Sequence, residues 1–506
     1  MTRPGTAAPV VVVGAGPVGL LLACELRAAG VPVVLVERLA RPMTESRAGQ
    51  LSSLTAELLH ERGFGALLDS AGHEPRAHFG GVGLDLSGLD SPFAGQWKVP
   101  QYRTEAALGE RARERGATVL RETELTGLDA PEGDEGPLMC EVRDPGGVRR
   151  IAARYVVGCD GAGSTVRRLA GFPVTATAAT RELLRADVTG VRIRDRRFER
   201  LPGGLAVAAT REGVTRVMMH AAGRPVTART EPPGFDEVVR RWAEVTGEDI
   251  SGGTPVWLDA FDNARGQADR YRRGRVLLAG DAAHWHLPIG GQALNTGLQD
   301  AVNLGWKLAA TVNGWAAPGL LDSYHAERHP VAARVLTHVT AQELLLLGGA
   351  AADPLLAVLT ELTGLPGVHT QLAATAANLE DRYGRPGTRI TGRRLAHLRL
   401  RTGTGPLRTT GPRPVLVRLT PAAPGPDTPG PDTPGPDPYG PDTDGLGRYG
   451  VPVRHAIDED GSLPGITTLL LRPDGYVAWA DDSEEDLDQA VATLLDAEGR
   501  KRNASL

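Results

Sequence analysis

The sequence predicts an α/β protein built from three domains, and three observations support this. A strand, a glycine-rich turn, a helix and a second strand follow one another over residues 9–37, which is the pattern of a parallel α/β domain. Short strand-like runs alternate over residues 172–270, which is typical of a separate β-sheet domain. The composition changes near residue 396, and 506 residues are too many for a single core.

The first predicted element is a strand over residues 9–13, followed by a turn with the spacing G-x-G-x-x-G. A helix over residues 17–29 and a strand over residues 31–36, which ends at an acid, complete a Rossmann-like unit. The helix N-terminus favours a pyrophosphate, and the acid is placed to bind a ribose. This unit alone does not distinguish FAD from NAD. The predicted nucleotide-binding residues are Gly14, Gly16, Pro17, Gly19, Glu37 and Arg38.

Two further motifs follow predicted strands. Residues 155–161 form a strand that runs into Asp160-Gly161, and Arg167 follows after a short turn. Residues 275–281 form a strand that ends at Gly280-Asp281, and residues 288–297 form a glycine-rich loop that opens a helix. The carboxyl ends of parallel strands are where α/β proteins bind ligands. Both motifs are therefore expected at one ligand site.

The three motifs together resemble those of the FAD-dependent aromatic hydroxylases of the para-hydroxybenzoate hydroxylase class, especially those that oxidise aromatic polyketides such as angucyclines. The resemblance covers nearly the whole chain and is weakest between residues 400 and 465. It implies FAD as cofactor and NADPH as co-substrate, without a separate nicotinamide domain. It also implies that Asp281 binds the ribityl chain, and that the N–H groups of Leu294 and Asn295 face the flavin pyrimidine ring. Further implied contacts are Arg47, Gln101, Arg103, Asp160, Pro288 and Gly291.

The sequence departs from the family pattern at two positions. Many relatives have Gly-Gly-Gln-Gly where this chain has residues 290–293 ending in Ala293, and an arginine is common where this chain has Leu54. The methyl group of Ala293 is expected to restrict movement of the flavin ring. Neither departure threatens FAD binding, but both leave open how the flavin moves and which reaction follows.

The middle of the chain is expected to cover the flavin with a β-sheet, so that the substrate lies between two domains. Candidate wall residues are Phe79, Phe93, Trp97, Met218, His220 and Trp257, with core packing as the alternative for each. The predicted domains are an FAD-binding domain of residues 1–75, 99–171 and 271–395, a β-sheet substrate domain of residues 76–98 and 172–270, and a C-terminal domain of residues 396–506.

Residues 299–345 are predicted to form long helices, on which His325 and His329 lie one turn apart. A third metal ligand is not evident, so packing or surface placement is predicted for both. Within residues 421–445 the unit Pro-Gly-Pro-Asp-Thr repeats, which predicts an exposed flexible loop. Residues 466–479 form a hairpin around Arg-Pro-Asp-Gly. The family resemblance implies a thioredoxin-like C-terminal domain, and the lack of CxxC favours a structural or dimer-contact role.

The resemblance also implies the reaction. NADPH reduces FAD, the reduced flavin reacts with molecular oxygen, and a flavin C4a-hydroperoxide hydroxylates an aromatic polyketide in antibiotic-type secondary metabolism. Because the cofactor performs this chemistry, no catalytic side chain is assigned. Two alternatives stay open: a Baeyer–Villiger oxidation of a related polyketide, and a non-catalytic flavin-binding partner of a biosynthetic enzyme. A flavin halogenase is disfavoured because Trp-x-Trp-x-Ile-Pro is missing, and an NAD dehydrogenase would leave Gly280-Asp281 without a task.

Composition argues against other classes. The net charge of -5 gives no electrostatic footprint for nucleic acid. The three cysteines form no CxxC pattern and suit a reducing cytoplasm. Residues 7–24 imitate a lipoprotein signal, but they also form the strand, turn and helix described above, which is the preferred interpretation. No other apolar stretch reaches the roughly 20 residues of a membrane helix. The exact substrate, the oxidised position and the oligomeric state, including a homodimer, stay open.

Overall fold

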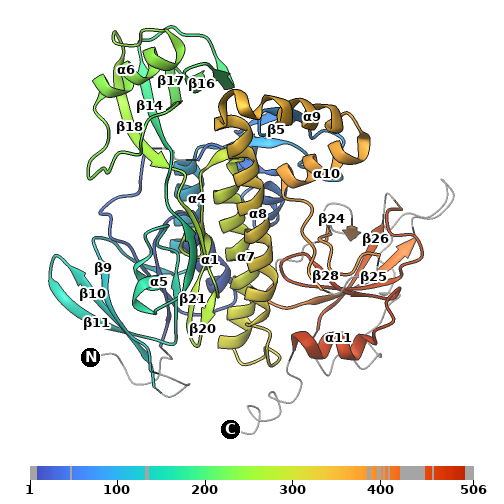
Figure 1. Ribbon diagram of the computed structural model, residues 1–506. Coiled ribbons are helices and arrows are strands. Elements are labelled where there is room, and N and C mark those ends of the chain that lie inside the picture. Colours follow the sequence, from blue (N-terminus) through green and yellow to red (C-terminus); the bar gives the residue numbers. More distant parts are fainter. Residues whose placement is uncertain are drawn as a thin grey trace.

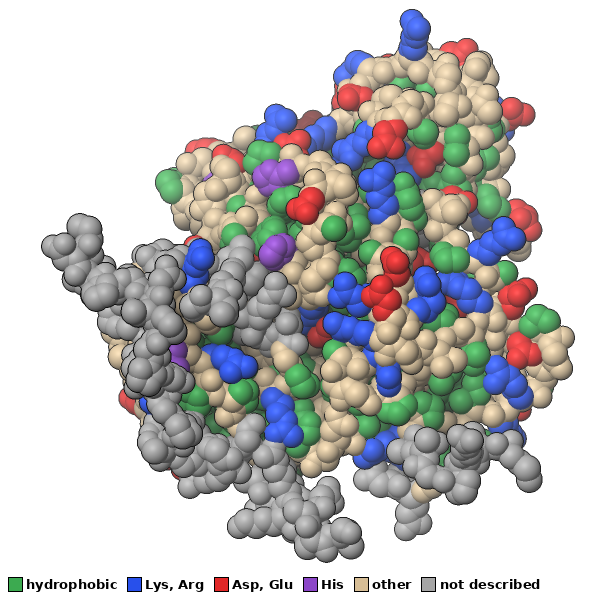
Figure 2. All heavy atoms as spheres, turned by 180° about the vertical axis from the view of Figure 1, so that it is seen from behind, with side chains coloured by type: hydrophobic (Ala, Val, Ile, Leu, Met, Phe, Trp, Pro, Cys, Tyr) green, Lys and Arg blue, Asp and Glu red, His purple; other side chains and the backbone are tan. Residues whose placement is uncertain are grey.

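The structure is a computed structural model and describes residues 8–45, 48–131, 136–384, 389–395, 400–402, 405–407, 411–421, 451–458 and 461–495. Two long helices, α7 (Gln292–Val312) and α8 (Ser323–Leu347), run side by side through the middle of the molecule (Figure 1). A β-sheet lies above them in this view, and the C-terminal sheet lies to their right. Acidic and basic side chains are interspersed over the face in Figure 2.

The N-terminal sheet has six strands in the order β20-β21-β12-β1-β2-β8. Their bounds are β1 (Val10–Val13), β2 (Val33–Val36), β8 (Thr118–Leu120), β12 (Tyr155–Gly158), β20 (Arg272–Arg273) and β21 (Val276–Leu278). All neighbours pair in parallel except β20 with β21. The predicted strand, turn, helix and strand at the N-terminus are confirmed, because α1 (Pro17–Ala28) joins β1 to β2.

The register of this sheet positions the motifs. Val13 lies opposite Val36 and Gly158, and Gly158 lies opposite Leu278. The carboxyl ends of four strands therefore meet at one edge. The glycine turn, Glu37, the Asp160-Gly161 turn and the Gly280-Asp281 turn begin at this edge, because each directly follows one of these strands. The core beneath them consists of the Val and Leu residues of the strands and of α1 and α7.

Short helices and small sheets surround this unit. The helices are α2 (Ser53–Glu61), α3 (Gly65–Asp69), α4 (Gln101–Glu114) and α5 (Thr165–Leu169). The small sheets contain β3 (Leu51–Ser52), β7 (Gln96–Lys98) and β4 (Gly72–Glu74), then β9 (Glu124–Asp129), β10 (Leu138–Asp144) and β11 (Gly147–Ala153), and finally β13 (Val174–Thr177), β19 (Arg265–Ala268) and β22 (His284–Trp285).

The sheet above the long helices is antiparallel, in the order β15-β16-β17-β14-β18. Its strands are β14 (Glu182–Thr189), β15 (Arg196–Leu201), β16 (Gly204–Arg211), β17 (Val214–Ala221) and β18 (Thr254–Asp262). One face packs on α6 (Phe235–Thr246), whose Trp242 is completely buried. The strands predicted within residues 172–270 are thus confirmed.

Residues 76–98, which are predicted to belong to the same domain, add no strands to this sheet. β5 (Arg76–Phe79) and β6 (Val82–Asp85) form a hairpin of their own, and β7 pairs with β3 and β4. The apolar face of the hairpin packs on α8 and on the helices α9 (Asp353–Thr363) and α10 (Pro366–Ala377). Alternation in the sequence predicted strands here, but it does not encode which strands pair.

The C-terminal sheet is mixed, in the order β24-β23-β26-β25-β27-β28. Its elements are β23 (Leu400–Thr402), β24 (Gly405–Pro406), β25 (Val415–Pro421), β26 (Val453–Asp458), β27 (Thr468–Leu471), β28 (Val477–Ala480) and α11 (Leu487–Leu494). The predicted hairpin is confirmed as β27 and β28, which pair antiparallel. Nearly all of the predicted Pro/Gly-rich loop lies outside the described residues.

Candidate active site

The glycines of the turn after β1 have two different roles. Gly14 has φ of 102°, and a Cβ there would lie 2.4 Å from the Cys159 carbonyl oxygen. A Cβ on Gly19 would lie 2.0 Å from the Gly14 carbonyl oxygen. The fold itself therefore requires both. A Cβ on Gly16 would meet nothing within 4 Å, so the space before α1 is open. Pro17 is the first residue of α1, and no side chain caps its N–H groups, which leaves them available to an anion.

Glu37 stabilises this turn from the end of β2. Its two carboxylate oxygens accept hydrogen bonds from the backbone N–H groups of Ala15 and Leu39, each at 2.8 Å. Each oxygen has a second lone pair, so the carboxylate can also accept from a ribose hydroxyl. The side chain of Arg38 is exposed beside it. The acid thus fixes the turn and remains suited to its predicted role.

Asp160 has a local task that the sequence did not reveal. Its carboxylate accepts hydrogen bonds from the N–H groups of Thr165 and Val166 at 2.7 and 3.1 Å and from Ser164 Oγ at 2.5 Å. The N–H groups at the start of α5 have no acceptor within the helix, and Asp160 supplies one. Asp160 therefore shapes the turn that follows β12.

Arg167 connects the second motif to the third. Its guanidinium donates to the carbonyl oxygen of Ala282 at 2.8 Å and to that of Ala162 at 2.5 Å. It also lies over the ring of Trp285, 4.4 Å from the ring centre. The Asp160-Gly161 and Gly280-Asp281 turns are thereby held together.

Asp281 follows β21 at the carboxyl edge of the sheet, within a single helical turn of residues 280–282, and it is exposed. Pro288 is exposed at the start of the next loop. Gly290 and Gly291 both have positive φ, at 74° and 69°. A side chain at Gly291 would also collide with Gln50, since a Cβ would lie 2.3 Å from its Nε2.

The start of α7 presents backbone donors next to this loop. Leu294 is the third residue of the helix, whose first N–H groups have no intrahelical acceptor. The side chain of Asn295 forms hydrogen bonds with the surrounding backbone. Its Oδ1 accepts from Ser52 N at 2.8 Å, and its Nδ2 donates to Gly291 O at 2.7 Å. The helix start and the loop are therefore rigidly joined to β3.

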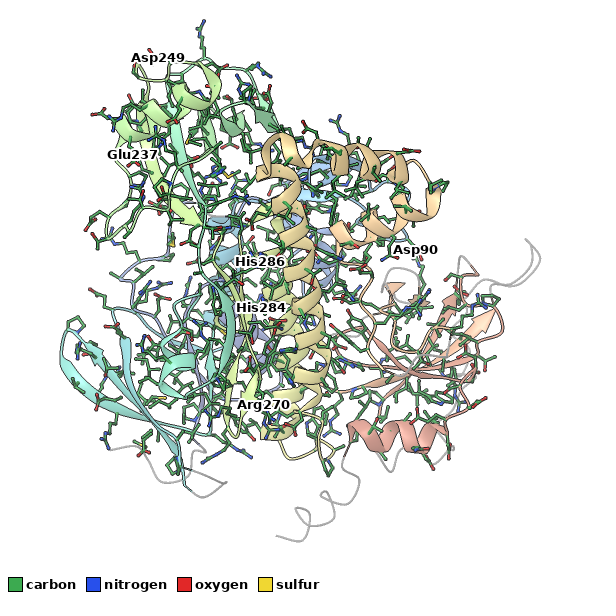
Figure 3. All side chains as sticks on the ribbon, viewed as in Figure 1. Asp90, Glu237, Asp249, Arg270, His284 and His286 are labelled. Atoms are coloured by element: carbon green, nitrogen blue, oxygen red, sulfur yellow. The ribbon has the colours of Figure 1, made fainter. Side chains whose placement is uncertain are left out.

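A buried ionic cluster supports the Gly280-Asp281 turn from behind. The carboxylate of Asp300 accepts from His284 Nε2 at 2.7 Å, from Arg328 Nε at 2.7 Å and from Gly280 N at 3.1 Å. Arg328 also donates to the Tyr383 hydroxyl at 2.7 Å. Burial acts to raise the pKa of Asp300, but His284 and Arg328 hold it below its ordinary value. Figure 3 shows His284 in the middle of the molecule, beside the long helices.

Two of the three remaining predicted cofactor contacts are described. Gln101 is the first residue of α4. Its side-chain Oε1 accepts from Ala48 N at 3.2 Å, and its backbone N–H donates to Ala48 O at 2.9 Å. Arg103 is partly exposed and forms a long ion pair of 3.9 Å with Glu212. Arg47 lies outside the described residues. Gln101 therefore anchors the backbone at Ala48.

Three predicted wall residues share one face of the antiparallel sheet, opposite the face that packs on α6. Met218 and His220 alternate with core residues along β17, and Trp257 lies on β18. Between them, Arg185 forms a 2.5 Å ion pair with Asp259 and lies over Trp257, 4.7 Å from the ring centre. This face thus combines aromatic, sulfur and charged groups.

His220 is buried, and its Nδ1 hydrogen bonds to the carbonyl oxygen of Glu182 at 2.9 Å. Burial lowers the pKa of His220. The imidazole is therefore neutral at physiological pH.

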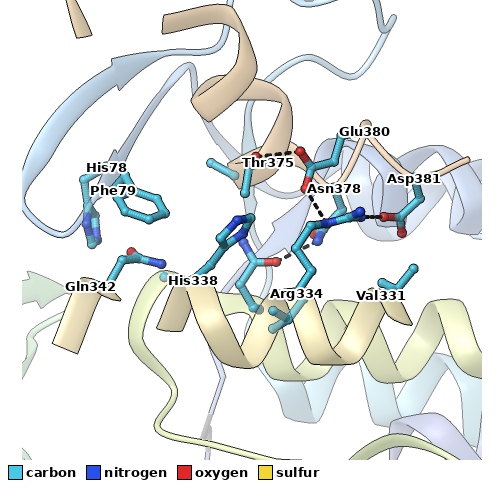
Figure 4. A pocket seen from close by; sticks show the side chains of 14 residues that line it. His78, Phe79, Val331, Arg334, His338, Gln342, Thr375, Asn378, Glu380 and Asp381 are labelled. Atoms are coloured by element: carbon cyan, nitrogen blue, oxygen red, sulfur yellow. Dashed lines mark hydrogen bonds and ion pairs between the residues drawn. The ribbon is translucent and has the colours of Figure 1, made fainter. Parts of the chain in front are cut away.

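The other three predicted wall residues pack in the core instead. Phe93 and Trp97 join the core of the N-terminal domain and lie 5.7 Å apart between ring centres. Phe79 packs under α8 and α10. It lines a cavity of about 20 Å³, room for about one water molecule, together with His338 and Gln342 (Figure 4).

Sequence reasoning missed several buried or half-buried polar residues near the motifs. Asp300 and Arg328 lie in segments that the family resemblance covers, but no role was assigned to either. Lys98 and Gln50 lie beside the glycine-rich loop of residues 288–291, here named the flavin loop. The only signal for Lys98 in the sequence is the scarcity of lysine in the chain. Among the described residues, no group of three His, Cys, Asp or Glu side chains is placed to hold a metal, and no helix has the length and apolar character needed to cross a membrane.

Comparisons with known proteins agree with this geometry. Residues 7–339 match the family model described as FAD binding domain, and residues 388–497 match the model described as aromatic-ring hydroxylase, C-terminal. The chain is 38% identical to a 12-dehydrotetracycline 5-monooxygenase/anhydrotetracycline 6-monooxygenase of Streptomyces rimosus, over 96% of this chain and 97% of the relative. It is 36% identical to a dialkyldecalin synthase of Streptomyces rugosporus, over 96% and 98% of the two chains.

A solved structure is similar over the same extent. The crystal structure of CabE, an aromatic hydroxylase from angucycline biosynthesis, superposes with a TM-score of 0.87 at 40% identity and covers 96% of this chain and 99% of its own. The predicted α/β fold and the predicted flavin-dependent monooxygenase are confirmed by these matches. The chain belongs to the family of FAD-binding aromatic-ring hydroxylases.

Proposed function

We propose that this chain uses NADPH and molecular oxygen to hydroxylate an aromatic polyketide with FAD as its cofactor. The observation that carries the proposal is the meeting of three flavin motifs at one sheet edge, next to the first turn of α7. The polyketide class is supported by relatives named for anhydrotetracycline and for angucycline biosynthesis.

The residues at this edge fit FAD. The open space at Gly16 and the uncapped start of α1 suit a pyrophosphate. Glu37 would accept from the ribose, and Asp281 would accept from the ribityl hydroxyls. The N–H groups at Leu294 and Asn295 would face the pyrimidine ring and stabilise negative charge there. When bound, FAD supplies the redox and oxygen chemistry.

The chain's own contribution would be to bind, orient and exclude water. The face of the antiparallel sheet with Met218, Arg185 and Trp257 would cover the substrate, and the scaffold around Asp300 would keep the flavin loop rigid. Water exclusion matters because it favours oxygen transfer over release of hydrogen peroxide. The proposal also includes a cytoplasmic location, which suits three free cysteines. The proposal further includes a homodimer, which size-exclusion chromatography with light scattering tests.

The first experiment is a visible spectrum of the purified protein before and after anaerobic addition of NADPH. Flavin bands that bleach, with faster bleaching when anhydrotetracycline is added, would support the proposal. Aerobic turnover under ¹⁸O₂ with mass spectrometry would then detect an added oxygen, and the connectivity of the product would separate hydroxylation from Baeyer–Villiger insertion. A colourless protein that cannot be reconstituted with FAD would refute the proposal.

A matched pair of variants tests the pyrophosphate position. Gly16→Ala is expected to fold, because its new methyl group meets no protein atom within 4 Å, but to weaken FAD binding at least tenfold by occupying the ligand's space. Gly19→Ala is expected to fail in folding, because its Cβ would collide with the Gly14 carbonyl oxygen. A Gly16→Ala protein with unchanged FAD affinity would contradict the assignment.

A second candidate function is suggested by the dialkyldecalin synthase among the relatives. We infer that a chain acting as a synthase and not as a monooxygenase would consume no NADPH. Ligand-stimulated NADPH oxidation with an oxygenated product would exclude this function for the present chain, whereas tight FAD binding without any NADPH oxidation would favour it.

A further inference from the structure

Lys98 carries a charge that the surrounding protein does not neutralise. It lies at the end of β7, and its Nζ donates to Gln50 Oε1 at 2.9 Å and to Gln96 Oε1 at 3.0 Å. Both acceptors are neutral amides. Among the described residues, no carboxylate forms an ion pair with this ammonium. A partly buried charge held only by neutral groups is costly in the free protein, which points to a ligand that supplies the counter-charge.

The groups around Lys98 add positive charge instead of removing it. Arg197 and Arg211 of the antiparallel sheet repel its ammonium through their charge, and the charge of Lys98 in turn acts on His78 of β5. The carboxylate that acts on it, Glu74, is already paired with Arg76 at 2.9 Å.

These charges fix the protonation states at neutral pH. Burial lowers the pKa of Lys98 to about 8, and Arg211 and Arg197 lower it further in the same direction. Burial likewise lowers the pKa of His78 to about 4. At neutral pH the cluster therefore contains a protonated Lys98, two guanidinium groups and a neutral imidazole.

The cluster adjoins the proposed flavin site. Gln50, which accepts from Lys98, packs so closely on Gly291 that a Cβ there would lie 2.3 Å from its Nε2. Asn295 Nδ2 also donates to the carbonyl oxygen of Gln50, at 3.4 Å. Lys98 is thus one side chain away from the loop that opens α7. His78 and Arg197 also line a groove of about 300 Å³, together with Phe198.

We propose that Lys98, assisted by Arg197 and Arg211, forms a binding site for an acidic phenol or enol of the aromatic substrate and holds it as the anion beside the flavin loop. The inference rests on the proposed function, because it names the acidic group by which that substrate is recognised. The chemical change is a proton transfer only: the phenol O–H bond breaks, the proton leaves to bulk water, and no electron changes hands.

The physical consequence is that the ligand ionises more readily when it is bound. An ammonium within hydrogen-bond distance stabilises a phenolate and lowers the pKa of the phenol. A phenolate is more electron-rich than its phenol, so it reacts more readily with an electrophilic oxygen. The site would therefore both select acidic aromatics and activate them.

The test uses the FAD-loaded full chain without NADPH, and alizarin as the probe. Alizarin is a hydroxyanthraquinone whose visible spectrum changes when its phenol ionises. The pH at which it ionises is measured free, bound to wild-type protein, and bound to Lys98→Met, Lys98→Arg and Arg150→Met. Arg150 is an exposed cation on β11, so its variant removes the same charge away from the site.

We expect wild-type protein and Arg150→Met to bind alizarin as the anion, with a phenol pKa below that of free alizarin. Lys98→Met should raise the pKa of the bound phenol by about 1 to 2 relative to wild type, the size expected for one nearby charge at a partly exposed site. Lys98→Arg should retain most of the effect. Equal pKa values for wild type and Lys98→Met would overturn the proposal, as would a wild-type protein that binds no alizarin or binds it un-ionised.

Two features keep the result separate from other failures. Should Lys98→Met not fold, the comparison of free with wild-type-bound alizarin and the Lys98→Arg variant still decide the question. Because no turnover is involved, a protein that oxygenates anhydrotetracycline but leaves bound alizarin un-ionised keeps the proposed function and loses this inference. A protein that ionises bound alizarin but oxygenates no substrate keeps this inference and loses the proposed function.

Discussion

Arg472→Met should remove one cation from a buried cluster that joins the C-terminal domain to α8. The guanidinium donates to both Glu327 oxygens at 2.7 and 2.8 Å and to both Asp474 oxygens at 2.9 and 2.6 Å. Lys307 adds a second cation, 2.7 Å from Glu327. The side chain of Arg472 is 7% exposed and that of Asp474 is 1% exposed. Removing one partner of such a pair leaves an uncompensated buried charge, so we expect a loss of about 3–5 kcal/mol in the free energy of unfolding.

The assay is guanidinium-induced unfolding followed by tryptophan fluorescence. The chain has seven tryptophans, so their summed emission follows global unfolding. Trp306, which donates from Nε1 to Asp474 Oδ2 at 3.0 Å, contributes from within the cluster. Arg149→Met is the matched control: Arg149 forms a 2.8 Å pair with Asp144, but its side chain is 44% exposed, so the expected loss is below about 1 kcal/mol.

A double variant tests the charge argument directly. Arg472→Met with Glu327→Gln removes one charge of each sign and leaves Lys307 opposite Asp474. It should cost clearly less than the sum of the two single changes. The reasoning is refuted if Arg472→Met costs no more than Arg149→Met, or if the two single losses simply add.

Two further predictions concern the flavin scaffold. Burial, together with the charge of Glu37, raises the pKa of Glu105 to about 7, against an attraction from Arg121 that lowers it. Because the pKa of Glu105 is higher in the folded than in the unfolded protein, stability is lost as pH rises from about 4.5 to 7. The free energy of unfolding of Glu105→Gln, measured by thermal or denaturant unfolding, should therefore equal that of wild type at pH 4 and exceed it by up to ~3 kcal/mol at pH 8. A gain in stability that does not depend on pH would contradict this. Asn295→Ala should weaken FAD binding about tenfold, because it leaves the buried N–H of Ser52 without its acceptor. Fluorescence titration with FAD measures this, and an unchanged affinity for FAD would contradict it.

The sequence was sufficient for the parts of the fold that depend on local spacing. The glycine spacing and the acid after the second strand predict the turn at Gly14, because φ restrictions and strand length are local properties. The hairpin around Arg472 follows from turn chemistry in the same way. The edge at which Asp281 lies follows from the parallel order of the strands.

Contacts between distant segments could not be predicted in this way. The surroundings of Lys98 include Gln50 and Arg197, which are far from it in sequence, and no periodicity in the sequence connects the three residues. The same holds for the cluster of Asp300 and Arg328. The sequence assigned Asp160 to the cofactor by resemblance, whereas its hydrogen bonds to the start of α5 depend on the turn geometry. Residues 76–98 were assigned to the same β-sheet domain as residues 172–270, but their partner strands could not be predicted, because alternation carries no information about the partner strand.

The clusters around Arg472 and Arg394 affect how this gene can recombine with those of its relatives. Arg394, near the start of the C-terminal region, pairs with Glu57 and Glu61 of α2, just as Arg472 pairs with Glu327. A crossover near residue 390 would separate these charges from their partners and bury them unmatched. Hybrids between relatives should therefore survive only where both sides of each pair are inherited together, so the two ends of the chain are expected to co-evolve as one unit.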